Sequence, residues 1–345
     1  MGLQEVWFVL IAVLFTGYFV LEGFDFGVGM HMPILGRGRD ATADTRRRVM
    51  LNTIGPVWDG NEVWLITAGG ALFAAFPEWY ATLFSGFYLP LLLILLALIL
   101  RVCAIEWRGK IDDPVWRRRC DYGIIVGSWV PAVLWGVAFA NIIRGVAIDA
   151  DKQFVGTLFD LLNPYALLGG VTTALVFALH GAVFLALKTD GDVREDAVKL
   201  ARRLAVPAIV VAGGFVLWTQ LDHGKGWTWI LVGVAAVALV IVAALTAVER
   251  EGWAFVFTTV AIIATSVLLF ASLFPNVMPS TLDPAWSLTI ENASSSPYTL
   301  KVMTWAAAIM TPVVLLYQGW TYWVFRQRIS APQIPPSIGL KLGAK

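Results

Sequence analysis

Charged residues are scarce in this chain of 345 residues, where they make up 14% of the sequence against 58% for hydrophobic residues. A soluble domain usually carries about 25% charged residues. The apolar residues occur in stretches of about 20, which is the length at which a helix crosses a bilayer. This composition excludes an ordinary soluble domain and predicts an all-α membrane protein.

Cysteine and histidine are also rare. The two cysteines, Cys103 and Cys120, form neither a disulfide framework nor a metal-binding spacing. Of the three histidines, only His180 lies deep enough in an apolar stretch to be considered as a haem ligand. A lone histidine in a membrane helix is more often a hydrogen-bonded packing residue, so we expect no cofactor and no metal to be bound by this chain's own ligands. The net charge of +1 does not indicate a nucleic-acid partner, because the basic residues sit in short clusters between apolar stretches.

Nine apolar stretches are predicted to span the membrane within a single polytopic domain, residues 1–325. Their approximate bounds are 6–30, 49–75, 79–103, 121–144, 164–187, 203–221, 226–247, 252–274 and 301–325. The remaining residues, 326–345, include SAPQIPPS and are expected to form an extended or disordered cytoplasmic tail.

The distribution of lysine and arginine predicts the orientation in the membrane. Twenty of the 25 basic residues fall in the loops and the tail on one side of the predicted spans. Because cytoplasmic loops carry an excess of Lys and Arg, this side is expected to be cytoplasmic. The N-terminus is then outside and the C-terminus inside, which agrees with an odd number of spans.

Acidic residues inside two predicted spans are the most informative feature of the sequence. A charged side chain within a bilayer is costly and by default marks a functional site. Asp25 lies in the first predicted span, and Asp59 and Glu62 lie in the second, within PVWDGNEVWLITAGG. At about 1.5 Å per residue, Asp59 is roughly 15 Å from the inner end of its helix and close to mid-membrane. Asp59 and Glu62 are three residues apart and are expected to share a helix face.

Two interpretations of these acids remain open. In the first, a carboxylate proton relay runs inward from the cytoplasmic side through Asp25 to Asp59 and Glu62, because a buried carboxyl group can hold and pass a proton. In the second, Asp59 or Glu62 pairs with Arg101 or with a tryptophan N–H group and locks helices together. Arg101 is itself expected to reach toward the interface or to pair with an acid such as Glu106.

Other residues near the two acids favour a hydrated polar spot in the second span. Pro56 cannot donate a backbone hydrogen bond, so it loosens the turn that precedes the acids. The residues expected to support the site are Trp58, Asn61, Trp64 and Arg101. Both tryptophans are too deep for an interfacial aromatic belt. Glu22, which like Asp25 lies nearer the interface, favours a structural role.

Eight longer sequence segments, spread over nearly the whole chain, can be compared with known families. They are EGFDFGVGM (22–30), RRRVMLNTIGPVWDGNEVWLITAGGALFAAFP (46–77), SGFYLPLLL (85–93), DYGIIVGSWVPAVLWGVAFANIIRGV (121–146), LLNPYALLGGV (161–171), WAFVFT (253–258), LFPNVMPS (273–280) and LLYQGWTYWVF (315–325). In this order they closely resemble subunit II of the cytochrome bd-type quinol oxidases, and WDGNEVWLITAGGALFAAFP is the most specific of them. The compact length and short loops resemble the actinobacterial branch.

The resemblance implies a respiratory oxidoreductase of the bacterial cytoplasmic membrane that oxidises quinol and reduces dioxygen to water. This chain would be its non-haem subunit II, with two four-helix bundles and one peripheral helix. It would stabilise a partner, subunit I, which holds haem b and haem d, and would contribute a cytoplasm-facing proton pathway. By resemblance, Asp59 matches the family's proton-pathway acid and Asp25 matches a polar residue of that route. A structural quinone, membrane lipid and a small single-helix accessory subunit are further expected partners.

Two alternatives to a proton-conducting oxidase subunit follow from the same residues. Buried acids in broken helices also suit a proton-coupled secondary transporter. The concentration of polar residues in one half of the chain, without a matching set in the other, argues mildly against a transporter. In the other alternative, the chain is a purely structural mate of subunit I, and Asp59 only holds helices in place.

Overall fold

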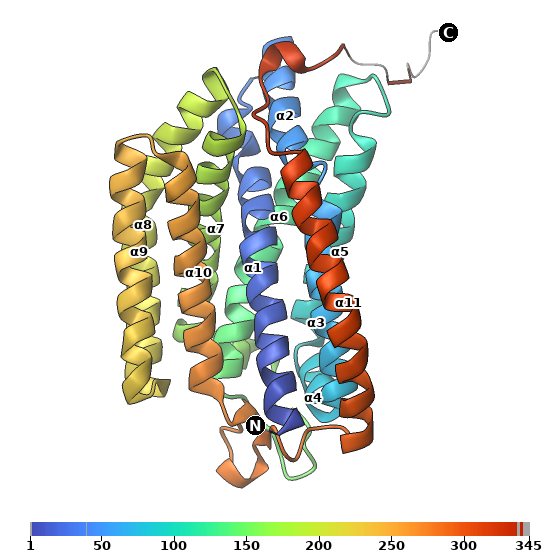
Figure 1. Cartoon of the computed structure of the whole chain (residues 1–345), viewed down its shortest axis with the longest axis vertical. Coiled ribbons are helices and arrows are strands. Elements are labelled where there is room, and N and C mark those ends of the chain that lie inside the picture. The colour runs from blue at the N-terminus through green and yellow to red at the C-terminus, as the bar shows by residue number, and fades with distance from the viewer. Residues whose placement is uncertain (1, 39, 337–338, 341–345) are drawn as a thin grey trace.

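The computed structural model describes residues 2–38, 40–336 and 339–340, which form a bundle of long helices (Figure 1). The helices are α1 (Leu3–Leu35), α2 (Ala41–Ile54), α3 (Trp58–Ala75), α4 (Pro77–Gly86), α5 (Tyr88–Trp107), α6 (Pro114–Arg144), α7 (Pro164–Lys188), α8 (Asp192–His223), α9 (Trp229–Ala247), α10 (Glu251–Leu273) and α11 (Pro297–Val324). Short 3-10 turns are η1 (Leu158–Leu161), η2 (Gly226–Thr228), η3 (Pro284–Trp286) and η4 (Ala331–Gln333).

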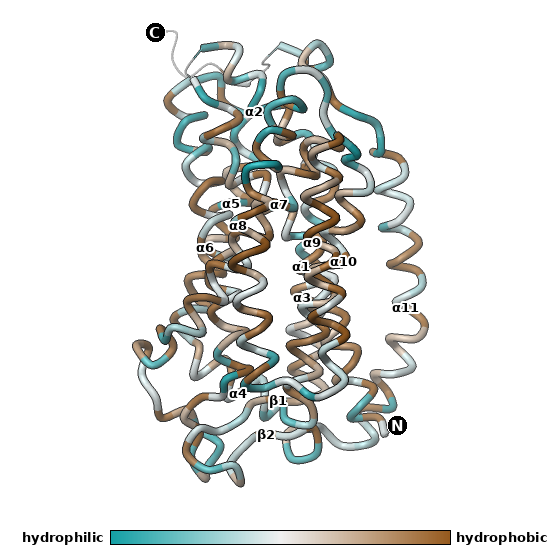
Figure 2. The backbone as a smooth tube through the Cα atoms, turned by 90° about the vertical axis from the view of Figure 1, so that its left-hand side faces the viewer, coloured by the Kyte–Doolittle hydropathy of each residue, from teal (hydrophilic) through white to brown (hydrophobic). Residues whose placement is uncertain are grey.

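Within the described residues, eight helices are long and apolar enough to cross a membrane. They are α1, α5, α6, α7, α8, η2 with α9, α10 and α11. Figure 2 shows hydrophobic residues along the middle of the molecule and hydrophilic residues gathered toward its two ends. The chain is therefore an all-α, multi-pass membrane protein, as its composition predicts.

The second predicted span, 49–75, is not one continuous helix. Helix α2 ends at Ile54, and α3 begins only at Trp58. Pro56 lies in this gap, where its missing N–H and its ring interrupt the helical hydrogen bonds. Because α3 also carries two acids and an asparagine in its first turns, it is not among the eight apolar spans. A single helix over 49–75 is therefore wrong, and the break lies at Pro56, where the sequence predicts a loosened turn.

The third predicted span, 79–103, also contains a break. Helix α4 ends at Gly86, and α5 runs on from Tyr88 to Trp107, beyond the predicted end of the span. Helix α4 begins with Pro77, which suits the first turn of a helix because its missing N–H has no partner there in any case. The extension of α5 matters for the site, because it places Arg101 well inside the helix.

The helices fall into two groups with one helix outside them. Helices α7, α8, α9 and α10 pack in sequence, and α10 returns to α7. Helices α1, α3, α5 and α6 form the other group, in which α1 and α6 both pack against α7. Helix α11 lies along the edge of the second group, beside α1 and α3, and only 6% of its most apolar stretch is buried (Figure 1).

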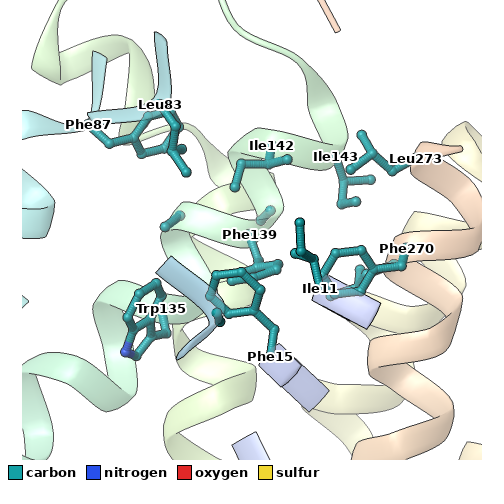
Figure 3. Close-up of a cluster of buried hydrophobic side chains, with 14 of the residues drawn as sticks. Ile11, Phe15, Leu83, Phe87, Trp135, Phe139, Ile142, Ile143, Phe270 and Leu273 are labelled. Carbon is teal, nitrogen blue, oxygen red and sulfur yellow. The ribbon is translucent and has the colours of Figure 1, made fainter. Parts of the chain in front are cut away.

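An aromatic cluster holds the two groups together. Phe15 of α1 lies against Phe139 of α6, with ring centroids 5.1 Å apart, and Phe139 lies 5.8 Å from Phe270 of α10 (Figure 3). Trp135 of α6 joins the same cluster, and its Nε1 donates a hydrogen bond of 3.2 Å to the hydroxyl of Tyr18. Stacked and edge-on rings bury large areas with a defined geometry, so this cluster fixes how α1, α6 and α10 meet.

Close contact between α1 and α7 depends on paired glycines. A Cβ atom built on Gly27 would lie 2.2 Å from the carbonyl oxygen of Phe177, and one on Gly181 would lie 2.4 Å from the Cα of Gly27. Small residues let membrane helices approach backbone to backbone. The two glycines therefore bring α7 against the segment of α1 that carries the buried acids.

The connections lie at the two ends of the bundle. At the end with the N-terminus, β1 (Asn276–Met278) and β2 (Leu288–Thr289) form a small antiparallel pair within the loop before α11. The opposite end carries α2 and the segment that follows α11 (Figure 1).

The segment after α11 is hydrogen-bonded to this end of the bundle. The backbone N–H of Ile329 donates to the carbonyl of Lys188, and Arg48 donates a hydrogen bond of 2.7 Å to the carbonyl of Pro335. Residues 326–336 include η4. Disorder of the tail stays a prediction, and residues 337–338 and 341–345 lie outside the described part of the chain.

Candidate functional site

A cluster of ionisable side chains is enclosed where α1, α3 and α5 meet. Glu22 and Asp25 of α1 and Arg101 of α5 are fully buried. Glu22 and Asp25 are three residues apart and therefore lie on one face of α1. Glu62 of α3 completes the group, and its side chain is 13% exposed. We refer to Glu22, Asp25, Glu62 and Arg101 as the acid cluster.

Arg101 is the cation at the centre of the acid cluster. Its Nη1 donates hydrogen bonds to Glu22 Oε2 at 2.8 Å and to Glu62 Oε1 at 3.2 Å. The guanidinium carbon also lies 4.8 Å from the centroid of the Phe26 ring, a cation–π distance. A single side chain from α5 thus binds α1 and α3 together.

Arg101 pairs with acids, as one of the two predictions expects, but its partners are Glu22 and Glu62 and not Glu106, and it does not reach the interface. Because α5 continues to Trp107, Arg101 lies roughly 9 Å inside the helix end. Its Cβ packs against Gly127 of α6, where an added Cβ would come within 2.5 Å. Because α5 packs closely against α6 at this point, the Arg101 side chain is fully buried and its partners lie inside the protein. The ion pair between Glu62 and Arg101 that the second interpretation names is present, with an N–O distance of 3.2 Å.

Asn61 links Asp25 to α11. Its Nδ2 donates a hydrogen bond of 2.7 Å to Asp25 Oδ2, and its Oδ1 accepts a bond of 2.7 Å from the hydroxyl of Tyr322. Trp64 Nε1 donates to Gln318 Oε1 at 2.8 Å. Asn61 and Trp64 are predicted from the sequence to support the site, but their partners on α11, Tyr322 and Gln318, are not.

A sequence signal for Gln318 and Tyr322 does exist. Both lie within LLYQGWTYWVF, in an otherwise apolar predicted span, and their spacing of four places them on one helix face. Which helix this polar pair faces depends on long-range packing, which no local pattern contains.

Asp59 lies apart from the acid cluster. Its side chain is exposed at the surface of the chain, and it makes no hydrogen bond or ion pair with any residue that the structure describes. Helix α3 begins at Trp58, so Asp59 occupies its first turn, while Glu62 one turn later faces Arg101. Trp58 is partly buried. The structure thus brings together Asp25, Asn61, Glu62 and Arg101 from the predicted set and leaves Asp59 on the outside.

The charges of the acid cluster do not balance. Three carboxyl groups surround one guanidinium group, and a buried carboxylate without a partner costs several kcal/mol. Among the described residues, four buried polar atoms of the cluster have no hydrogen-bond partner: Glu22 Oε1, Asp25 Oδ1, Arg101 Nε and Arg101 Nη2. Sharing protons among the carboxyl groups removes the excess negative charge. The chemistry that this arrangement can perform is the holding and transfer of protons.

A second set of charges lies at the α2 end of the molecule. Arg108 donates to Asp121 at 2.6 Å and to Asp44 at 2.8 Å, and these residues adjoin Arg47 and Arg117. A cavity of about 450 Å³ lies here, lined by residues of α2, of the start of α6 and of the end of α1. It includes Met32, which is seven residues or roughly 10 Å along α1 from Asp25. The cavity and the acid cluster are thus separate along α1, with the cavity at the end of the helix and the cluster further inside.

His180 does not fit an axial haem ligand. It is fully buried, its Nδ1 lies 2.6 Å from Thr258 Oγ1, and its Nε2 lies 3.1 Å from the carbonyl oxygen of Val20. With both ring nitrogens engaged, it packs as a hydrogen-bonded residue. Among the described residues, no group of three or more His, Cys, Asp and Glu side chains could hold a metal ion.

Comparison with known proteins gives consistent results. The family described as "Cytochrome bd terminal oxidase subunit II" matches residues 3–325. The chain is 43% identical to the cytochrome bd ubiquinol oxidase subunit 2 of Bacillus subtilis, over 95% of this chain and 97% of that protein. It is 37% identical to the cytochrome bd-I ubiquinol oxidase subunit 2 of Escherichia coli K12, over 96% of each.

The fold is also found among solved structures. A chain in the structure of bd oxidase from Geobacillus thermodenitrificans matches with a TM-score of 0.78 and 17% identity, over 94% of this chain and 97% of that one. At this level of identity, the match concerns the fold alone.

Proposed function

The chain belongs to the cytochrome bd terminal oxidase subunit II family, and we propose that it is the non-haem subunit II of a quinol:dioxygen oxidoreductase in the bacterial cytoplasmic membrane. The family match along residues 3–325 carries this proposal. The complex would oxidise quinol and reduce dioxygen to water, with haem b and haem d in the partner subunit I. A structural quinone and a small accessory subunit remain part of the proposal.

The test of this assignment is purification of the chain from its native membrane. We expect a second membrane chain to co-purify and to carry b- and d-type haem absorption bands, while this chain alone shows none. Haem bands in pure single-chain material would contradict the assignment of cofactors. Proton-coupled uptake of a solute by this chain alone in liposomes would favour a secondary transporter instead.

In the proposed topology, the broken pair α2 and α3 counts as the second of nine spans. Two four-helix groups and the peripheral α11 then complete the subunit, with the N-terminus outside and the α2 end in the cytoplasm. The basic residues in the loops at the α2 end support this orientation through the positive-inside rule.

For the chemistry, we propose that the acid cluster and Asp59 form a proton pathway from the cytoplasm toward the partner subunit. The excess of carboxyl groups over Arg101 supports this role, because the cluster must hold protons to avoid uncompensated buried charge. The cavity near Met32 would supply protons from the α2 end. In this pathway, Asp25 and Glu62 hold protons, and Arg101 keeps the carboxyl group of Glu62 close to that of Glu22.

Asp59 would be the exit of this pathway. It is exposed on α3, beside Val63 and Ile66, which are 43% and 72% exposed. A charged side chain facing the centre of a bilayer costs roughly 2.5–3.5 kcal/mol on insertion scales. Burial against a polar surface of subunit I avoids that cost and directs the carboxyl group at the subunit where protons are consumed.

The variant Asp59→Asn tests the pathway, because the amide keeps the shape but cannot pass a proton. We expect quinol-driven oxygen consumption by the assembled complex to fall by at least tenfold, which corresponds to about 1.4 kcal/mol. The haem spectrum should stay unchanged. A matched control is Glu195→Gln, which neutralises an exposed acid on α8 and should retain full activity. Full activity of Asp59→Asn in a normally assembled complex would leave this residue a purely structural role.

A further inference from the structure

Helix α11 contributes two polar side chains to the surroundings of the acid cluster, although it is otherwise peripheral. Its one buried residue in the described chain is Leu300, near its start. At the other end of the helix, Gln318 and Tyr322 reach Trp64 and Asn61 on α3. A weakly buried helix that makes specific polar contacts at a buried site has a role other than filling space.

The hydrogen bonds in this contact have a defined direction. An indole N–H can only donate, so Trp64 fixes Gln318 with its Oε1 toward the indole. The amide nitrogen of Gln318 then faces α3, where its Nε2 lies 3.4 Å from Asn61 Oδ1. The hydroxyl of Tyr322 lies 2.7 Å from the same oxygen. Two donors on α11 therefore hold the carbonyl oxygen of Asn61 toward α11.

This direction is passed on to Asp25. With Oδ1 held by α11, Asn61 presents its amide nitrogen to Asp25, and Nδ2 donates to Asp25 Oδ2 at 2.7 Å. If the amide flipped, Asn61 would present an acceptor to Asp25 instead of a donor. The other carboxyl oxygen, Asp25 Oδ1, is buried and receives no hydrogen bond from an N–H or O–H group of the described residues, and the carboxyl group of Glu22 adjoins Asp25 on the same face of α1.

We propose that Gln318 and Tyr322 are positioning residues of the proton pathway: through Asn61 they determine that Asp25 takes up and releases its proton at Oδ1. This inference rests on the proposed proton pathway. Neither residue carries the proton, since each acts only on the orientation of the Asn61 amide. The position of α11 thereby determines at which carboxyl oxygen Asp25 carries its proton.

A double-mutant cycle in the assembled complex tests this inference. We expect Tyr322→Phe to lower the quinol-oxidase turnover about fivefold, with the KM for quinol unchanged, because one neutral hydrogen bond is lost. The double variant Tyr322→Phe/Asp25→Asn should be no slower than Asp25→Asn alone, because Tyr322 acts only through Asp25. Independent, multiplicative losses would overturn the positioning role.

Vibrational spectroscopy supplies a readout that does not depend on turnover. The carboxylic-acid C=O band of Asp25 is identified by its loss in Asp25→Asn, and Tyr322→Phe should displace this band. If Asp25→Asn retained full turnover, the proton pathway would fail, whereas a displaced band in Tyr322→Phe would still support the positioning of Asp25. An unmoved band would overturn the inference.

Two control variants lie on the same helix. Tyr317→Phe removes an exposed hydroxyl, and Thr304→Ala removes an acceptor that Trp7 uses to hold the far end of α11. Both should leave turnover and the Asp25 band unchanged. If Tyr322→Phe fails to assemble, Gln318→Ala takes its place in the cycle. Failure of both to assemble, with both controls intact, would make the pair a helix attachment and overturn the proposal.

Discussion

Helices α1, α3 and α5 enclose three acids and an arginine, whereas α7 to α10 meet mainly through small and apolar side chains. On α8 the contact surface is a stripe of buried alanines, namely Ala201, Ala205, Ala208 and Ala212. Small residues allow close van der Waals contact, which is the main attraction between helices in lipid. The α1–α3–α5 group instead depends on one cation to hold helices that carry excess negative charge. One half of the molecule is therefore built for packing, whereas in the other half the residues that hold the helices together are also those of the proposed proton pathway.

The largest effect is expected when Arg101, the cation of the acid cluster, is removed. In Arg101→Leu, the carboxyl groups of Glu22 and Glu62 lose their partner, and breaking a buried ion pair on one side costs about 3–5 kcal/mol. We expect the complex to assemble poorly, measured as the yield of haem-containing complex. Arg203→Leu removes an exposed arginine of α8 and serves as the control. A normal yield of Arg101→Leu would show that the ion pairs of Arg101 are not needed to hold these helices together.

A smaller effect is expected in the alanine stripe. Ala208→Leu inserts a bulky side chain at a fully buried position of α8, and overpacking typically costs about 1–3 kcal/mol. The thermal unfolding temperature of the complex should fall, while the turnover per assembled complex stays unchanged. Val210→Leu, at a position 66% exposed on the same helix, should change neither quantity. Reduced turnover in Ala208→Leu would show that this half also affects the chemistry.

The smallest effect is expected for a surface ion pair of the same half. Lys199 lies 3.4 Å from Asp196 and 4.0 Å from Glu195, and all three side chains are exposed. Exposed pairs of this kind contribute roughly 0–1 kcal/mol. Lys199→Ala should leave both the unfolding temperature and the turnover within experimental error. A clear loss of stability would indicate that this surface contacts something in the complex.

The sequence predicts the presence of helices far better than their continuity. Long apolar stretches determine where most helices lie, because the backbone must satisfy its own hydrogen bonds in lipid. The prediction fails at 49–75, where Pro56 separates α2 from α3. Proline is tolerated in many membrane helices; Pro131 and Pro312 lie inside α6 and α11 without ending them. Whether a proline bends or breaks a helix depends on its neighbours in space.

The candidate site is predictable in its residue types and in one pairing, that of Glu62 with Arg101, which the sequence left as one of two interpretations; its other pairings are not predictable. Acids in a span mark Asp25 and Glu62 from the sequence alone, since their burial is costly. The two partners of Arg101, Glu22 and Glu62, follow from the length of α5 and from its contact with Gly127 of α6. The exposure of Asp59 follows from the point at which α3 begins.

The sequence by itself determined that this protein is a polytopic helical membrane protein of the subunit II family, because hydropathy and the long motifs are properties of consecutive residues. Only the tertiary structure decided that Arg101 holds Glu22 and Glu62, that Asn61 orients Asp25 and that Tyr322 reaches Asn61 from 261 positions along the chain. These contacts join residues from helices far apart in the chain. Their geometry is set by how whole helices pack, and a local pattern carries no information about that packing.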